Sequence, residues 1–109
     1  MSRLSQMLLA GSAIACLAAV PAKAEIVIGA ALNLTGIQAP MDEPGFRGAQ
    51  VAIKELNDAG GLLGEPVKLV TMDGKSDPVT VGNATVQLID DGAQLILAPC
   101  DFDFGSPAR

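Results

Sequence analysis

The sequence predicts an α/β fold with a parallel β-sheet built from two successive βαβ units. Three observations lead to this prediction. A continuous apolar run, typical of a strand buried on both faces, follows residue 24. Two segments with helical spacing of apolar residues come next, and each of them leads into another short apolar run. Two helical connections between three apolar runs predict three parallel strands in one sheet, and both crossovers are expected to be right-handed.

Residues 1–24 have the three parts of a secretory signal peptide. Arg3 supplies a positive charge, Leu8 to Val20 form an apolar middle, and Ala22-Lys23-Ala24 provides the small side chains of a cleavage site. The apolar middle is too short to span a bilayer as a permanent helix. We therefore expect cleavage after Ala24, export to the periplasm, and a mature chain of residues 25–109.

The two cysteines fall on either side of the expected cleavage site. Cys16 leaves with the leader, unless the loose lipobox Ala13-Ile14-Ala15-Cys16 makes the protein a lipoprotein anchored there, an alternative that the sequence leaves open. Cys100 then remains alone, so the mature chain has no internal disulfide. The sequence has no His and no spaced cluster of Cys or carboxylates, so no metal site is expected.

The charge of the mature chain argues against nucleic acid as a partner. Residues 25–109 carry 12 acidic and five basic side chains, a net charge near −7. They show no basic patch with interleaved aromatic residues, the pattern that binds phosphate backbones and bases. An acidic surface is also the ordinary state of a secreted protein, so the charge alone indicates no particular function.

The first predicted βαβ unit begins with Ile26 to Leu32, an apolar run typical of a central, fully buried strand. Asn33 to Gly45 contains two prolines and two glycines without a regular period, so we expect a long loop there. Phe46 to Ala59 has apolar residues at three- and four-residue spacing, which predicts an amphipathic helix that Gly60-Gly61 ends. Val67 to Met72 alternates apolar and polar residues and predicts the second strand.

The second unit continues with a helix that is predicted to run to about Asp91. Asp77 is the expected N-cap, and Pro78 takes the first helical position, where a missing N–H costs nothing. The side chains predicted to be buried on this helix are those of Val81, Ala84, Thr85, Leu88 and Ile89. Leu95 to Ala98 predicts a short third strand, and Pro99 to Gly105 the loop after it.

Ligands of a doubly wound sheet bind beyond the carboxyl ends of its strands. The segments expected at that edge are Asn33 to Gly45, Asp73 to Asp77 and Pro99 to Gly105. A dinucleotide site would need Gly-x-Gly-x-x-Gly directly after the first strand, and the glycines found there are too far apart, so no cofactor is expected. Asp42-Glu43 and Asp101 could imitate a phosphoacceptor site, but a secretory leader would place them away from cytoplasmic ATP.

Several short motifs of the mature chain occur in a specific order. They are Asn33-Leu34-Thr35-Gly36, Phe46-Arg47-Gly48-Ala49, Asn57-Asp58-Ala59-Gly60-Gly61, Gly64, Asp73 to Pro78, and Pro99 to Gly105. In this order they resemble the type I periplasmic binding proteins of the leucine/isoleucine/valine-binding family. The resemblance covers the whole mature chain and implies a protein of two α/β lobes, with residues 25–109 forming the amino-terminal part of lobe 1. Such proteins are several times longer, so we expect this chain to be a truncated or partial one.

The resemblance implies ligand contacts at Met41, Cys100, Asp101 and Phe102. The family places hydroxyl side chains of the loop after the third strand against the ligand's carboxylate, and this chain has Asp101 followed by Phe102 in that loop. Since like charges repel, either Asp101 points away or the ligand offers a cation, an amide or a hydroxyl there. Met41 lies near the position where members of the family have an aromatic side chain that contacts the ligand. Cys100 matches a family cysteine that can form a disulfide, but Ser76 occupies its partner's position, so that bond is absent.

Asp101, Phe102 and Cys100 also have ordinary structural interpretations. Asp101 would cap a helix or a turn. Phe102 and Phe104 would pack inside the lobe or between lobes, and Cys100 would fill a small buried space. The Asp42-Glu43 pair is expected to belong to a solvated loop.

The resemblance implies a non-enzymatic function. The protein would be the substrate-binding component of an ABC importer for branched-chain amino acids or a related small molecule, including amides and amines, with a membrane permease as its partner. Hinge closure on the ligand would be the mechanism. The alternative is a periplasmic ligand-sensing or amide-regulator receptor of the same fold without a transport role. An enzyme would need a nucleophile beside a base, and a chain without His offers poor candidates.

Overall fold

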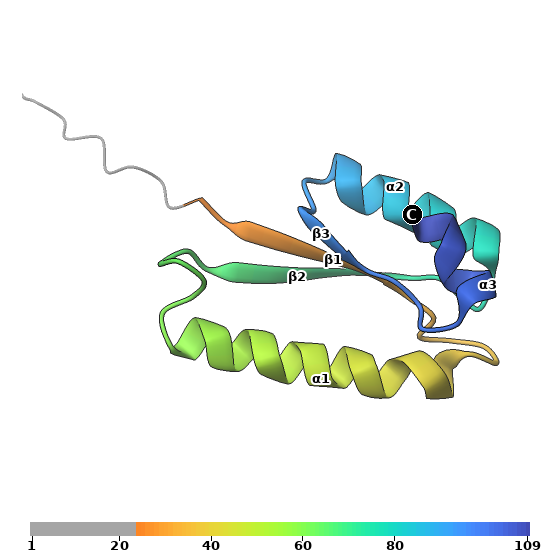
Figure 1. Cartoon of the computed structure of the whole chain (residues 1–109), viewed down its shortest axis with the longest axis horizontal. Coiled ribbons are helices and arrows are strands. Elements are labelled where there is room, and N and C mark those ends of the chain that lie inside the picture. The colour runs from red at the N-terminus through yellow and green to blue at the C-terminus, as the bar shows by residue number, and fades with distance from the viewer. Residues whose placement is uncertain (1–23) are drawn as a thin grey trace, which may run out of the picture.

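The computed structural model describes residues 24–109, in which strands and helices alternate (Figure 1). The elements are β1 (Ile26–Leu32), α1 (Ala39–Asp58), β2 (Val67–Asp73), α2 (Pro78–Asp90), β3 (Leu95–Leu97), α3 (Phe102–Gly105) and the 3-10 turn η1 (Ser106–Ala108). The strands form one parallel sheet in the order β2-β1-β3. The predicted α/β class and the central first strand are confirmed. The predicted signal peptide and lipobox lie outside the described residues, except for residue 24.

β1 occupies the centre of the sheet because both of its edges are paired. It pairs with β2 along its whole length, from Ile26 opposite Val67 to Leu32 opposite Asp73. Its other edge pairs with the three residues of β3. The segment 30–32 is buried, as expected for a strand that is covered on both faces.

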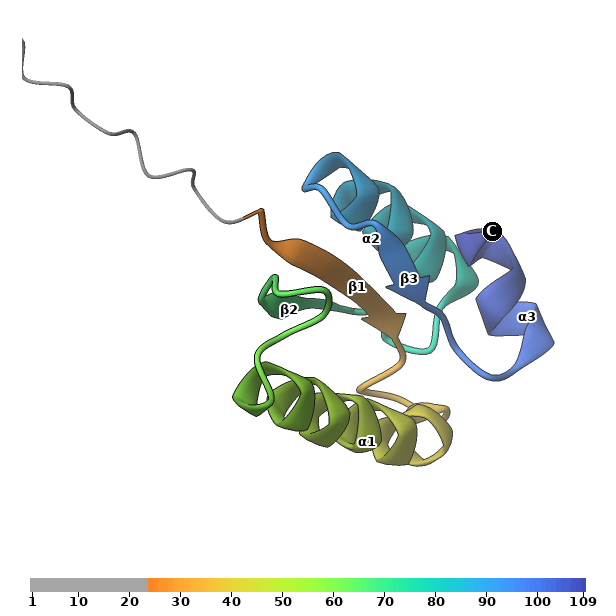
Figure 2. The same cartoon turned by 60° about the vertical axis from the view of Figure 1, so that its left-hand side comes forward.

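The sheet is covered by α1 on one face and by α2 on the other, and α3 lies beside α2 (Figures 1 and 2). The core lies on the α2 side, where Ala31 of β1 packs against Ala84 and Leu88. Ile89 was expected to be buried with them, and this expectation is wrong, because 54% of it is exposed. One residue along a helix turns the side chain by about 100°, so Ile89 leaves the stripe that Leu88 occupies. No helix within residues 24–109 combines the length and the apolarity that crossing a membrane requires.

α1 begins at Ala39 rather than at Phe46, so the interpretation of Asn33–Gly45 as a loop is wrong for its second half. Pro40 lies in the first turn, where no backbone N–H is needed. Pro44 lies one turn later and removes one helical hydrogen bond. The helix continues through it and packs on β1 and β2. The two prolines predict a loop when only the neighbouring sequence is considered. In the folded chain, the packing of α1 on the sheet outweighs the loss of one hydrogen bond.

The segment after β3 also contains more helix than predicted. Pro99–Gly105 was expected to be a loop, and its last four residues form α3. The carboxylate of Asp101 accepts a hydrogen bond from the backbone N–H of Asp103 at 2.9 Å, so Asp101 is the N-cap of this turn. α3 and η1 both pack against α2, which places the last described residues on the α2 side of the sheet (Figure 2).

Candidate functional site

The connections after β1 and β2 are joined at the carboxyl edge of the sheet by Asp73, the last residue of β2. One of its oxygens accepts hydrogen bonds from the backbone N–H groups of Leu34, Thr35 and Lys75, at 3.0, 3.3 and 2.8 Å. The other oxygen accepts the Thr35 hydroxyl at 2.7 Å. Burial raises the pKa of Asp73, but the hydrogen bonds from Thr35, Lys75 and Leu34 outweigh it and hold the pKa below its ordinary value. Asp73 therefore fixes the start of the β1 connection against the end of β2.

Ser76 makes a second set of bonds between the same two connections. Its hydroxyl oxygen accepts the backbone N–H of Gln38 at 3.0 Å, and the hydroxyl donates to the Thr35 carbonyl at 2.8 Å. Its own N–H donates to Oδ1 of Asn33 at 2.9 Å. Gly36 lies against this serine with φ +85°, and a Cβ there would come within 2.6 Å of the Ser76 hydroxyl oxygen. Ser76 thus has a structural role of its own, which the resemblance did not indicate.

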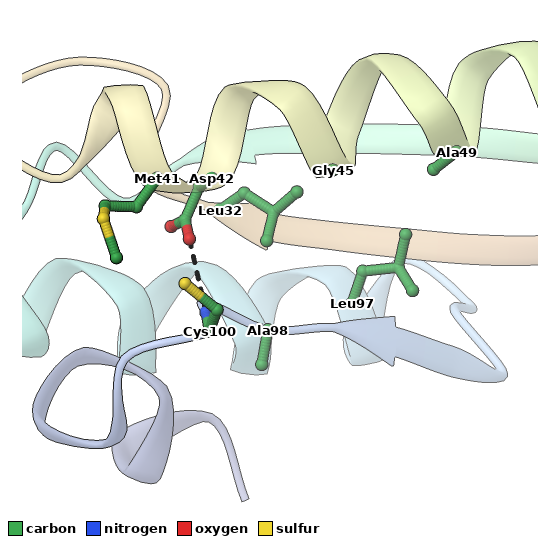
Figure 3. Close-up of a pocket in the computed structure, with 8 residues that line it drawn as sticks. All are labelled: Leu32, Met41, Asp42, Gly45, Ala49, Leu97, Ala98 and Cys100. Carbon is green, nitrogen blue, oxygen red and sulfur yellow. Dashed lines mark hydrogen bonds between the residues drawn. The ribbon is translucent and has the colours of Figure 1, made fainter.

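A cavity of about 240 Å³ lies beside these connections, between the start of α1 and the ends of β1 and β3 (Figure 3). Its walls are mostly apolar. The residues that line it are Leu32, Met41, Asp42, Gly45, Ala49, Leu97, Ala98 and Cys100. The resemblance implies four ligand contacts, and two of them, Met41 and Cys100, lie together on the wall of this cavity. They come from distant parts of the sequence, since Asp42, the neighbour of Met41, is 58 residues from Cys100.

Asp42 is the charged residue of the cavity wall. It is only 5% exposed, which contradicts its interpretation as part of a solvated loop. One carboxylate oxygen accepts the N–H of Asn33 at 2.9 Å. The other accepts the N–H of Cys100 at 3.2 Å, the bond that is dashed in Figure 3. A single carboxylate therefore ties the connection after β1 to the connection after β3.

Cys100 is exposed, so its interpretation as a small buried filler is wrong. A hydrogen bond from its thiol to the Asp42 carboxylate raises the pKa of Cys100, and desolvation and the negative charge of Asp42 act in the same direction. A thiol with a raised pKa stays protonated at neutral pH and is a weak nucleophile. The Cys100 side chain therefore offers the cavity a polarizable, uncharged surface.

Asp101 and Phe102 lie outside the residues that line the cavity. The side chain of Asp101 is turned toward α3, whose first turn it caps. Phe102 is 67% exposed, and the guanidinium of Arg109 lies 5.4 Å from the centre of its ring. The capping interpretation of Asp101 agrees with this arrangement. Ligand contacts by these two residues remain a prediction.

Sequence reasoning missed Asp42 as a residue of the candidate site. Its signal was present in Ala39-Pro40-Met41-Asp42, where a proline followed by an acidic residue is typical of a first helical turn. Placing the helix start at Phe46 left Asp42 in a loop and hid that signal. The bonds to Asn33 and Cys100 could not be inferred locally, because they depend on how the three connections meet in space.

Comparison with known proteins agrees with this arrangement. The family described as periplasmic binding protein matches residues 25–108. The chain belongs to this family. A solved structure of the same kind, the branched-chain amino acid transporter substrate binding protein LivJ from Streptococcus pneumoniae in complex with isoleucine, superposes with a TM-score of 0.75 at 27% identity. The superposition covers 78% of this chain and 25% of LivJ.

Curated relatives of this periplasmic binding protein include amino acid binding proteins. It is 36% identical over 92 residues to the Leu/Ile/Val-binding protein BraC3 of Rhizobium johnstonii, a match that covers 84% of this chain and 25% of BraC3. It is 39% identical over 69 residues to an amino acid binding protein of Pseudomonas aeruginosa, covering 63% of this chain and 18% of that protein. The chain thus spans about a quarter or less of the length of these relatives.

Proposed function

We propose that this chain contributes to the first ligand-binding lobe of the solute receptor of an ABC importer for amino acids or related small molecules. The names of the relatives support this proposal, since they bind leucine, isoleucine and valine or amino acids in general. The observation that carries it is the cavity at the carboxyl edge of the sheet, the place where doubly wound folds bind their ligands.

The hydrogen bonds around the cavity support a binding rather than a catalytic role. Asp42, Asp73 and Ser76 use their side chains to bond backbone groups, so they hold the connections in place. Cys100 is protonated at neutral pH and thus lacks the activation of a nucleophile. A pre-organised, mostly apolar cavity stabilises a bound small molecule and leaves it chemically unchanged.

In this proposal Met41 and Cys100 contact the ligand from the cavity wall. Asp101 and Phe102 follow directly in the chain and would contact parts of the ligand that extend beyond the cavity. The leader of residues 1–24 would deliver the protein to the periplasm, where a membrane permease receives the ligand. Hinge closure between two lobes would trap the ligand, because it contacts both lobes only in the closed state.

Uptake measurements test the proposal. Deleting the gene in the bacterium that encodes it is expected to abolish high-affinity uptake of one group of labelled amino acids, amides or amines, and restoring the gene is expected to restore it. Isoleucine, leucine and valine are the first substrates to assay, because the relatives bind them. Unchanged uptake of every substrate would contradict the import function. If the deletion abolished a ligand-dependent transcriptional response instead, the sensing function would replace the import function.

A further inference from the structure

We propose that Asp42 makes this cavity selective for a positively charged nitrogen, so that the ligand is a small aliphatic amine or an amino acid whose ammonium group faces this lobe. The inference rests on the proposed function, because it names the ligand class of the same cavity. It starts from the burial of Asp42, a residue that is only 5% exposed and lies on the cavity wall (Figure 3).

The first step is that Asp42 has no cationic partner among the described residues. The ion pairs within residues 24–109 are Arg47 with Glu43, Lys54 with Asp58, and Lys68 with Glu25. None of them includes Asp42. A buried carboxylate that is not paired with a cation is costly, and backbone N–H groups offset only part of that cost. A cation in the cavity would therefore be bound more tightly than a neutral group of the same shape.

The second step is that Asp42 has acceptor capacity left. A carboxylate has about four lone-pair sites. The N–H groups of Asn33 and Cys100 occupy one site on each oxygen. Each oxygen therefore keeps acceptor capacity for a donor that enters the cavity. An ammonium group has three N–H donors and no acceptor, so it can use this capacity without bringing a repulsive atom next to Asp42.

The third step concerns the rest of the wall. Leu32, Leu97 and Ala49 offer apolar contact, and Gly45 leaves the α1 side open, since a Cβ there would meet nothing within 4 Å. The matching ligand thus has a short alkyl body and one charged nitrogen. A ligand carboxylate would be repelled by Asp42, so an amino acid would have to bind with its ammonium group toward Asp42 and its carboxylate turned away from this wall.

Three probes with the same branched alkyl body test the inference on the full chain. Isobutylammonium, isobutanol and isobutyrate are titrated at pH 7, and binding is followed by NMR through the methyl signals of Leu32, Ala49 and Leu97. Isobutylammonium is expected to bind roughly tenfold or more tightly than isobutanol, the scale of a charge-assisted hydrogen bond. Isobutyrate is expected not to shift these signals. Equal binding of all three probes, or no binding of any, would overturn the inference.

Salt and matched variants distinguish the effect of Asp42 on amine binding from the effect of the net negative charge of the chain. The preference for the amine is expected to persist in 0.5 M NaCl, because salt screens exposed charges far more than buried ones. Asp42→Asn is expected to remove it, whereas Glu43→Gln, which removes the same charge from a surface residue, is expected to keep it. If Asp42→Asn does not fold, the probe series in the unchanged chain still decides. A preference that disappears in salt would sink the proposal.

The two proposals can fail separately. If the deletion strain loses uptake only of ligands without a basic nitrogen, the import function stands and the amine selectivity falls. If isobutylammonium binds as expected while no uptake depends on the gene, the selectivity stands and the import function falls.

Discussion

Thr35 donates two hydrogen bonds to Asp73, one from its hydroxyl at 2.7 Å and one from its backbone N–H at 3.3 Å, although 38 residues separate them in the sequence. The pair joins the connection after β1 to the end of β2. Because both residues lie at the carboxyl edge of the sheet, this bond pair shapes the edge that carries the cavity. The loops of the candidate site are thus held by charge-assisted hydrogen bonds rather than by apolar packing alone.

The first prediction concerns stability in acid. The pKa of Asp73 is lowered in the folded chain, so its carboxylate stabilises the fold above the unfolded pKa of about 4, and that contribution is lost as pH falls below it. Urea unfolding at pH 6 and pH 3.5 should therefore show a larger loss of stability for the unchanged chain than for Asp73→Asn. Equal losses in the two proteins would show that Asp73 is not the group responsible.

A second prediction concerns Asn57, near the end of α1. Its amide donates to the carbonyl of Val67 at 2.7 Å and accepts the N–H of Val67 at 2.8 Å, so it pairs both backbone groups at the start of β2. Asn57→Ala is expected to lower the free energy of unfolding by about 1–2 kcal/mol. Asn57→Asp is expected to cost more, because an acceptor would then face the Val67 carbonyl. Gln50→Ala, on the exposed surface of the same helix, is the control and should change little.

A third prediction contrasts two glycines. Gly48 lies inside α1, and a Cβ there would meet nothing within 4 Å, so Gly48→Ala is expected to stabilise the chain by about 0.5–1 kcal/mol through the lower entropy of its unfolded state. Gly61 has φ +85°, and a Cβ there would overlap the Glu65 carbonyl. Gly61→Ala should therefore destabilise. Denaturant unfolding of both variants tests the contrast, and a stabilised Gly61→Ala would refute the geometry of this turn.

The strands and α2 were predictable from the sequence, whereas the start of α1 and the candidate site were only partly so. The run Ile26–Leu32 identifies a buried strand by its composition, and Asp77-Pro78 marks a helix start by local chemistry, so neither depends on distant residues. Asp42 differs, because its carboxylate accepts a hydrogen bond from the N–H of Cys100, 58 residues away. The cavity exists only once β1 and β3 lie side by side, and no local pattern encodes that contact.

The last prediction uses Cys100 to report on Asp42. The hydrogen bond from the thiol to the Asp42 carboxylate raises the pKa of Cys100, so at pH 8 the thiolate fraction is smaller than for an ordinary exposed thiol. Alkylation by iodoacetamide at pH 8 is therefore expected to be slower for the folded chain than for the chain unfolded in urea. Asp42→Asn should speed the reaction of the folded chain, because it removes the negative charge and replaces one of the two acceptor oxygens by an NH2 donor. Glu43→Gln should leave the rate nearly unchanged, since Glu43 pairs with Arg47 on the surface. If both variants reacted at the unchanged rate, the Asp42 carboxylate would not contact the thiol, and the arrangement of this cavity wall would have to be revised.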